Sequence, residues 1–146
     1  VLDMSACDRE TAQDKIFQSK LLYVSGGNTF YLLQELKKKE LLFLIKEQIA
    51  DGMVYVGESA GAVITAENID YIRLMDDKEV AGELSDTVAL HEADFYLLPH
   101  VGEDPFAESA QAILNTYGDK LNLLPLNNRQ AVLVEDEEVK VLVENK

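Results

Sequence analysis

The chain has 146 residues, and its 13 Lys and Arg against 27 Asp and Glu give a formal net charge of −14. This balance argues against a nucleic-acid partner, because phosphate binding needs clustered basic residues. The 47% hydrophobic content argues against disorder, and the apolar runs are far shorter than the roughly 20 residues that span a bilayer, so no membrane partner is expected. A single cysteine, Cys7, cannot form an internal disulfide, which favours a reducing, cytoplasmic location.

The first predicted elements are a strand and two helices. Residues 20–25 form an apolar run that ends at two glycines, which is typical of a buried strand entering a tight turn. Asn28 or Thr29 then offers an N-cap for an amphipathic helix. A second helix is predicted over residues 41–49, and Gly52 stands where a glycine would end it.

A second buried strand is predicted at residues 53–56, followed by the serine-containing turn analysed below. The segment 68–90 is acidic and irregular, so we expect a long surface excursion there. A third apolar strand is predicted at residues 93–98. The Asp104-Pro105 pair is typical of a helix start, and Gly118 would close that helix.

Three further strands complete the predicted fold, at residues 121–126, 130–134 and 139–143, the last two forming a hairpin. Alternation of strands with helices predicts a single α/β domain over residues 1–146, with a doubly wound, mostly parallel sheet, helices on both faces and a terminal β-hairpin. Residues 1–4 read as an isolated piece of strand, so we expect the strand-helix unit that normally opens such a sheet to be missing.

The pentapeptide Gly57-Glu58-Ser59-Ala60-Gly61 is the strongest functional signal in the sequence. A nucleophilic serine on a sharp strand-to-helix turn needs small residues two positions to either side, and an apolar strand precedes this turn. We therefore predict Ser59 as a nucleophile. The alternative is a glycine-rich turn with a capping serine.

A serine nucleophile requires a general base, for which the sequence offers two histidines. His100 follows a predicted buried strand and so falls at the carboxyl edge of the sheet, where Ser59 also lies. His91 precedes that strand and would lie at the opposite edge. We therefore predict His100 as the base.

Chemistry alone does not select which acid orients the histidine. The oxyanion of the tetrahedral intermediate has two candidate backbone donors. The amide of Ala60 follows the nucleophile, and the Gly26-Gly27 turn would supply the second donor. A phosphate-binding loop at these glycines would need a third glycine that is absent. No metal or other cofactor is expected. The candidate acids are Asp76, Asp77, Glu79, Glu83, Asp86, Glu103 and Asp104.

Three motifs in order carry a resemblance to a known family: residues 23–33 (YVSGGNTFYLL), residues 57–62 (GESAGA) and residues 98–100 (LPH). Together they resemble the dipeptidase E and cyanophycinase-like serine peptidases, which are similar in fold to class I glutamine amidotransferases. The resemblance covers about residues 20–143.

The resemblance implies a Ser-His-Asp triad of Ser59, His100 and Asp77, with Asp76 as the alternative acid if the alignment slips by one position. It also implies that Gly27 and Ala60 form the oxyanion hole. The implied substrates are small peptides, with aspartyl dipeptides as one candidate class.

Members of this family are longer at the N-terminus, so we expect a fragment, a misassigned start or a homo-oligomer that covers exposed strand edges. The favoured function is a serine peptidase acting on short peptides. The alternatives are a catalytically inactive binding or scaffold homologue and an esterase or amidase with a non-peptide substrate.

Overall fold

The computed structural model describes residues 1–136 and 138–144, and two short strands organise its first half. Strand β1 (Leu21–Val24) pairs in parallel with β2 (Val54–Gly57). Because parallel strands end at the same edge, the glycine turn after β1 and the serine pentapeptide after β2 are neighbours. Both strands are confirmed within one or two residues of the predicted ranges, but the prediction that they are buried is wrong for their alternate, exposed side chains.

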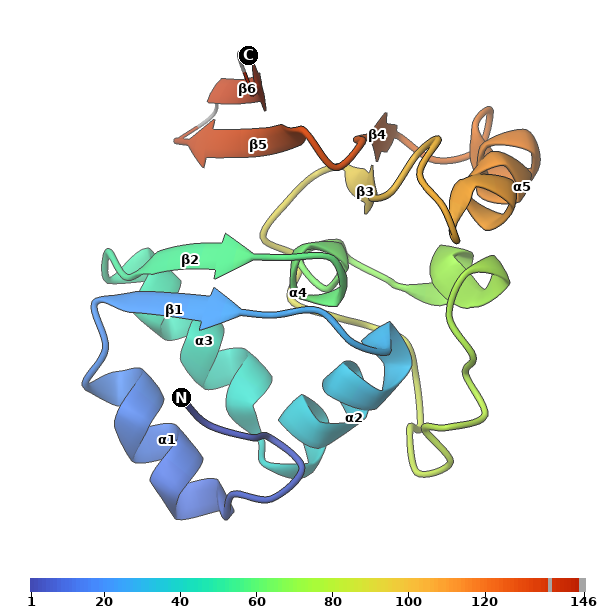
Figure 1. Cartoon of the computed structure of the whole chain (residues 1–146). Helices are drawn as coiled ribbons and strands as arrows, with labels where there is room; N and C mark the ends of the chain where they lie inside the picture. Colours follow the sequence, from blue (N-terminus) through green and yellow to red (C-terminus); the bar gives the residue numbers. More distant parts are fainter. Residues whose placement is uncertain (137, 145–146) are drawn as a thin grey trace.

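Three helices lie on one side of this strand pair (Figure 1): α1 (Arg9–Phe17), α2 (Thr29–Lys38) and α3 (Leu41–Ala50). As predicted, the side chain of Asn28 caps α2 by accepting a first-turn amide hydrogen bond at 3.0 Å. Gly52 follows α3 with a positive φ of 96°, a conformation that glycine adopts without strain. None of the helices among the described residues has the length and apolar composition to cross a membrane.

The N-terminal segment differs from the expected strand. Residues 1–4 lead into a turn, and α1 then begins after Asp8, whose carboxylate accepts the Thr11 amide at 2.8 Å. Only two residues of this helix, Ala12 and Ile16, are buried. Two apolar residues four positions apart are too few to predict a helix from hydrophobic periodicity. The N-capping Asp8 is the sequence feature that indicates where this helix begins.

The second half contains another parallel pair, β3 (Tyr96–Leu98) with β4 (Leu123–Pro125). Helix α5 (Ala107–Tyr117) connects them and packs beside this pair in Figure 1. The helix starts later than predicted, because the chain makes a turn at Asp104-Pro105 and Phe106 becomes the residue before the first helical turn.

The chain ends in the predicted antiparallel hairpin of β5 (Gln130–Glu135) and β6 (Glu138–Val143). Its predicted turn includes residue 137, which lies outside the described residues. The α/β class is confirmed, with two parallel strand pairs and a terminal hairpin. Among the described residues, the hydrogen-bonded ladders are three separate pairs, β1-β2, β3-β4 and β5-β6.

The segment 68–90 contributes to the core, which corrects its interpretation as a surface excursion. A 3-10 helix, η1 (Asp70–Leu74), presents Tyr71 to the interior, and Ile69 and Leu90 are fully buried beside it. The Tyr71 hydroxyl donates to a β3 carbonyl at 2.5 Å, and burial raises its pKa. Most acidic residues of the segment are exposed, whereas its buried residues Ile69, Tyr71 and Leu90 belong to the main core.

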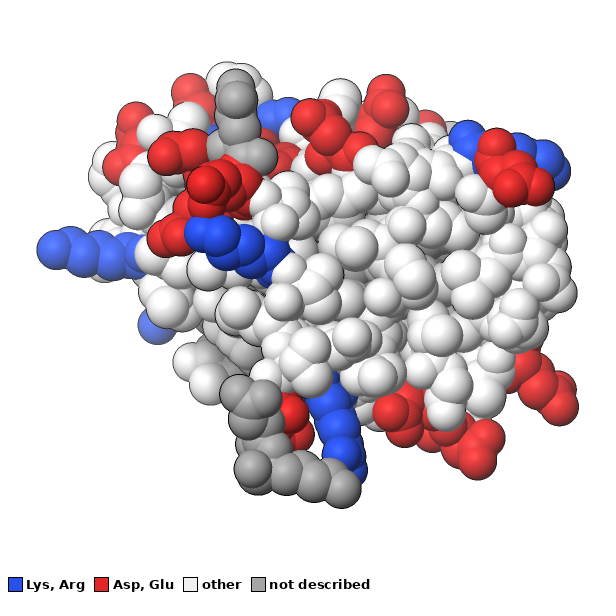
Figure 2. All heavy atoms as spheres, turned by 90° about the horizontal axis from the view of Figure 1, so that it is seen from above, with Lys and Arg blue, Asp and Glu red and all other residues white. Residues whose placement is uncertain are grey.

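The second face of the β1-β2 pair is open. Leu21, Tyr23 and Val54 are each 55% exposed and Val56 is 38% exposed, although these residue types favour burial. Figure 2, which views the molecule from the top of Figure 1, shows a broad area without charged side chains on the side away from α1, α2 and α3. On this open face Tyr23 pairs with Val56, one residue before β2 ends at Gly57.

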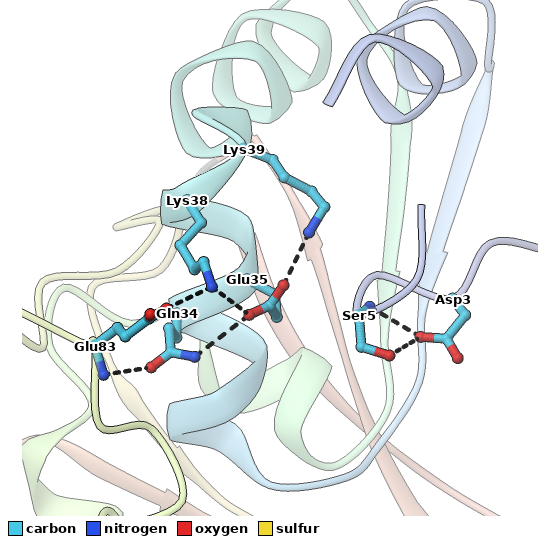
Figure 3. Close-up of polar contacts among 7 residues, drawn as sticks. All are labelled: Asp3, Ser5, Gln34, Glu35, Lys38, Lys39 and Glu83. Carbon is cyan, nitrogen blue, oxygen red and sulfur yellow. Dashed lines mark hydrogen bonds and ion pairs between the residues drawn. The ribbon is translucent and has the colours of Figure 1, made fainter. Parts of the chain in front are cut away.

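A buried ion pair holds the end of α2 (Figure 3). The Glu35 carboxylate accepts from Lys39 at 2.8 Å and from Gln34 at 3.3 Å, and Gln34 in turn accepts the amide of Glu83 at 2.8 Å. Burial alone would raise the pKa of Glu35, but the hydrogen bonds from Lys39 and Gln34 and the nearby lysine charges outweigh it and lower that pKa. The cluster thereby joins α2 to the segment that follows η1.

Replacing Glu35 with Gln should lower the free energy of unfolding at neutral pH by about 3 kcal/mol, because the mostly buried Lys39 ammonium would lose its carboxylate. A lowered carboxyl pKa stabilises the fold above the unfolded-state value, and this contribution is lost as the pH falls through the lower folded-state pKa. Urea unfolding should therefore show a wild-type advantage that shrinks below about pH 4.

The matched control is Glu83→Gln, because Glu83 pairs with Lys38 at an exposed position and should contribute under about 1 kcal/mol. Equal losses for the Glu35 and Glu83 variants, or a Glu35 effect that does not change with pH, would contradict this account of the buried pair.

Candidate active site

Ser59 sits on a strand-to-helix turn between β2 and α4 (Ala60–Val63). Its backbone is strained, with φ 50° and ψ −111°, outside the conformations that serine normally adopts. A Cβ placed on Gly57 would lie 2.4 Å from the carbonyl oxygen of Gly61, and one on Gly61 would lie 2.1 Å from the Val24 carbonyl oxygen. The turn therefore requires both glycines, which is the steric demand that the pentapeptide predicted.

Two further contacts fix the position of this turn. The Tyr55 hydroxyl, on the core side of β2, donates to the Gly61 carbonyl at 2.6 Å, and burial raises the Tyr55 pKa. On the other side, a Cβ on Gly26 would lie 3.2 Å from the Ser59 Cβ. The glycine turn after β1 thus lies directly against the serine side chain.

Of the two residues predicted for the oxyanion hole, Ala60 follows the serine in the chain and Gly27 follows Gly26, which lies against the serine. Ala60 is the first residue of α4, so its amide has no intrahelical partner. Gly27 has φ 134°, a region that only glycine enters readily, and it follows the Gly26 position that touches Ser59. The β1 turn therefore brings a second backbone segment to the serine hydroxyl.

His100 is brought to Ser59 by the chain that leaves β3. Its Nε2 lies 2.9 Å from the Ser59 Oγ, across 41 residues of sequence. The imidazole stacks on Phe106, with ring centroids 4.9 Å apart and planes inclined by 26°. A positive φ of 61° turns the His100 backbone so that the ring faces the serine.

The other imidazole nitrogen meets a residue that the sequence analysis missed. Nδ1 of His100 lies 2.7 Å from Oδ1 of Asn128, in the connection between β4 and β5. An amide oxygen can only accept, so Nδ1 carries the hydrogen and Nε2 is left to accept from the Ser59 hydroxyl. Asn128 therefore fixes both the orientation and the tautomer of the imidazole. The available sequence signal is the Asn127-Asn128 pair directly after a strand that ends at the same sheet edge.

Asp76 and Asp77, the acids implied by the family resemblance, make other contacts. The Asp76 carboxylate accepts the amide of Thr29 at 2.7 Å and its hydroxyl at 2.5 Å, which caps α2. The Asp77 carboxylate accepts the Glu79 amide at 2.8 Å, and its backbone carbonyl accepts from Asn28. In this structure the partner of His100 Nδ1 is Asn128 rather than either aspartate, and the two carboxylates accept the backbone amides of Thr29 and Glu79.

Other titratable residues considered earlier make contacts elsewhere, among them Glu83 and Asp86, which pair with Lys38 and Lys37 of α2. His91 is half exposed and lies 3.8 Å from the Asp94 carboxylate. Glu103 donates its backbone amide to the His100 carbonyl at 3.1 Å. Among the described residues, no three His, Cys, Asp or Glu side chains gather in a way that could hold a metal ion. The chemistry of the site is thus that of a serine, an imidazole, an amide and backbone donors.

The chain thus has an α/β fold with a serine on a sharp strand-to-helix turn and a histidine within hydrogen-bond distance of it. The sequence model of peptidase family S51 matches residues 1–142, and the chain belongs to this family.

Relatives and a solved structure agree with this assignment. An uncharacterized peptidase of Pasteurella multocida is 47% identical over 136 residues, which cover 93% of this chain and 66% of that protein. One of Listeria innocua is 48% identical, covering 84% of this chain and 58% of the relative. The Peptidase E of Shewanella amazonensis is 44% identical over 79 residues, covering 54% of this chain and 32% of that protein.

The crystal structure of a "Putative Peptidase E Protein" from Listeria monocytogenes superposes with a TM-score of 0.92 at 40% identity, covering 99% of this chain and 69% of that one. The chain spans about 58 to 66% of the length of the Pasteurella and Listeria innocua relatives. The family and the fold are therefore established over nearly all of this chain.

Proposed function

We propose that the chain carries the active site of a serine peptidase that hydrolyses short peptides with Ser59, His100 and Asn128. The observation that carries the proposal is the 2.9 Å contact between Ser59 Oγ and His100 Nε2 on a strained turn. Hydrogen-bond reach between a nucleophile and its base, with the base held by a third group, is the arrangement that activates serine. Membership of a peptidase family supports peptides as the substrate class.

The reaction follows from this geometry. His100 Nε2 accepts the hydroxyl proton while Ser59 Oγ forms a bond to the peptide carbonyl carbon. The amides of Ala60 and Gly27 donate to the oxyanion. The imidazolium then protonates the leaving amine as the carbon-nitrogen bond breaks, which leaves an acyl-enzyme. A water molecule, deprotonated by the same nitrogen, releases the acid and restores the serine.

Asn128 orients the His100 imidazole but carries no charge. Its oxygen holds the Nδ1 hydrogen at 2.7 Å, as an asparagine does in Cys-His-Asn sites, and the stack on Phe106 limits ring rotation. The imidazolium formed in the transition state is therefore stabilised by a dipole rather than by a carboxylate. An Asp77 triad would require that carboxylate to leave its backbone partner.

A fluorophosphonate probe read by intact mass tests the proposal, because only an activated serine is phosphonylated. Wild-type protein should gain the mass of one phosphonyl group, the probe less HF, and Ser59→Ala should gain none. Ser85→Ala is the matched control, since Ser85 is exposed and contacts only the neighbouring Asp86 among the described residues, and it should label like wild type.

Folded wild-type protein that stays unlabelled would overturn the proposal and favour an inactive binding or scaffold protein. If labelling succeeds, parallel panels of dipeptides, aspartyl dipeptides included, and of esters identify the substrate. Turnover of esters with every dipeptide untouched would favour an esterase instead of a peptidase.

A further inference from the structure

The short loop between β1 and α2, residues 25–28, carries Gly27 and is held at both of its ends; we call it the glycine loop. Before the loop, the Val24 carbonyl accepts the Glu58 amide at 2.9 Å, which fixes the end of β1 beside the elbow. After the loop, one carboxylate oxygen of Asp76 accepts both the Thr29 amide at 2.7 Å and the Thr29 hydroxyl at 2.5 Å. Asp76 is therefore the anchor on the α2 side of the glycine loop.

Gly27 itself depends on these anchors, because side-chain packing does not hold it. Apart from its chain neighbours, no heavy atom of the described residues lies within 4 Å of the position that a Cβ on Gly27 would take. Only two residues separate Gly27 from the Thr29 amide that Asp76 holds. The direction of the Gly27 amide, the second proposed oxyanion donor, is thus set by the chain on either side of it.

Asp76 is placed in turn by the part of the core that contacts β3. Its amide donates to the Ile72 carbonyl at 2.9 Å, and Ile72 and Tyr71 are buried in the main core. The Tyr71 hydroxyl donates at 2.5 Å to the carbonyl of Leu97, which precedes His100 by three residues. Asp76 therefore connects the glycine loop to the strand that leads to His100.

A second hydrogen bond runs beside the Asp76 contact but does not depend on a side chain there. The Asn28 side chain donates to the Asp77 backbone carbonyl at 2.8 Å, and it accepts the Tyr31 amide at 3.0 Å. Any residue at position 77 offers the same carbonyl, whereas the two bonds from Thr29 need an acceptor on the side chain at position 76. The Asp76 side chain is thus the part of the anchor that a substitution can test.

We propose that Asp76 is a positioning residue for the oxyanion hole: by holding Thr29, it keeps the Gly27 amide directed at the oxygen that becomes negative when Ser59 attacks. The inference rests on the proposed function, which it deepens by assigning a role to an acid outside the serine-histidine pair. One oxygen makes both contacts, so the role requires an acceptor and not a charge. An orienting triad acid differs, because its charge stabilises the imidazolium.

The test compares rates of fluorophosphonate labelling, since phosphonylation of the serine also places an oxygen in the oxyanion hole. Asp76→Ala should lower the labelling rate, and kcat for a hydrolysed dipeptide, by about 10- to 30-fold, because a misdirected donor stabilises the transition state less. KM should change by less than about 2-fold, since the oxyanion forms only after the substrate is bound. Asp76→Asn should stay within about 3-fold of wild type, because its amide oxygen can accept both hydrogen bonds from Thr29.

Asp8→Ala is the matched control, because Asp8 caps α1 by accepting the amide and the hydroxyl of Thr11, each at 2.8 Å. Its loss should lower the free energy of unfolding, as the loss of a helix cap does, and should leave the labelling rate unchanged. Urea unfolding of both alanine variants separates the effect on stability from the effect on rate.

An Asp76→Ala protein that labels like wild type, or an Asp8→Ala protein that slows as much, overturns the inference. Equally slow Asp76→Ala and Asp76→Asn proteins also overturn it, because a charge would then be required. If Asp76→Ala does not fold, Thr29→Val removes the buried hydroxyl contact alone and should slow labelling by about 3-fold, and an unchanged rate contradicts the inference. Wild type that stays unlabelled overturns the proposed function and this inference with it, whereas labelled wild type with unaffected variants overturns only the inference.

Discussion

His100→Ala should lower kcat/KM for a hydrolysed dipeptide by about 10⁴-fold or more, and adding Ser59→Ala should lower it little further. The reason is the 2.9 Å contact through which the hydroxyl proton passes, because either side chain without the other loses the same step. Steady-state kinetics on both single variants and the double variant measure the coupling. The small rate that remains would come from binding and from the amides of Ala60 and Gly27.

The matched histidine control is His91→Ala, because His91 is half exposed and pairs with an exposed aspartate away from the elbow. It should retain full kcat/KM. Losses that multiply in the double variant would mean that Ser59 and His100 act in separate steps, and the proton-transfer role of His100 would then be wrong.

The elbow could be predicted because its causes are local. A Cβ on Gly57 would lie 2.4 Å from the Gly61 carbonyl oxygen within the pentapeptide, and a Cβ on Gly61 would lie 2.1 Å from the Val24 carbonyl oxygen, at the end of the paired strand β1. His100 could be predicted from topology, since a residue just after a parallel strand lies at the carboxyl edge of the sheet. Both predictions use constraints that act within a few residues or along one sheet edge.

Asn128 could not be predicted in the same way. The contact joins residues 28 positions apart, and it depends on how the connection after β4 folds back toward His100. Charge is also a poor guide to this position, because the sequence predicts an acid as the orienting group, whereas Asp76 and Asp77 accept backbone amides at the start of α2 and in their own turn. An amide serves equally well where orientation and tautomer are the requirement.

The acidic segment 68–90 shows a second limit of sequence patterns. Its acidic residues indicate a solvated loop, yet several apolar residues between them are buried, including Ile69, Tyr71 and Leu90. In irregular chain, neither the 3.6-residue nor the two-residue period marks which side chains point inward. Only the packed structure shows that this segment connects the β1-β2 half to the β3-β4 half.

Asn128→Ala should lower kcat/KM by about 10- to 100-fold, because the imidazole would lose the acceptor that fixes its tautomer and angle. Asn128→Asp should keep that acceptor and add a negative charge beside the imidazolium of the transition state. Because residue 128 is exposed, the charge should raise kcat by only about 3- to 5-fold. Kinetics at low and high salt separate the two effects, since the gain from the aspartate should shrink as salt screens it.

Asn115→Ala, on the exposed side of α5, is the matched asparagine control and should leave kcat/KM unchanged. If Asn128→Ala hydrolyses dipeptides like wild type, stacking on Phe106 alone holds the ring, and Asn128 has no positioning role. If Asn128→Asp is as slow as Asn128→Ala, a charge at this position misdirects the imidazole. An aspartate variant faster than wild type, with the alanine variant slower, would show that the site needs an acceptor at Nδ1 and works without the charge that most serine triads add.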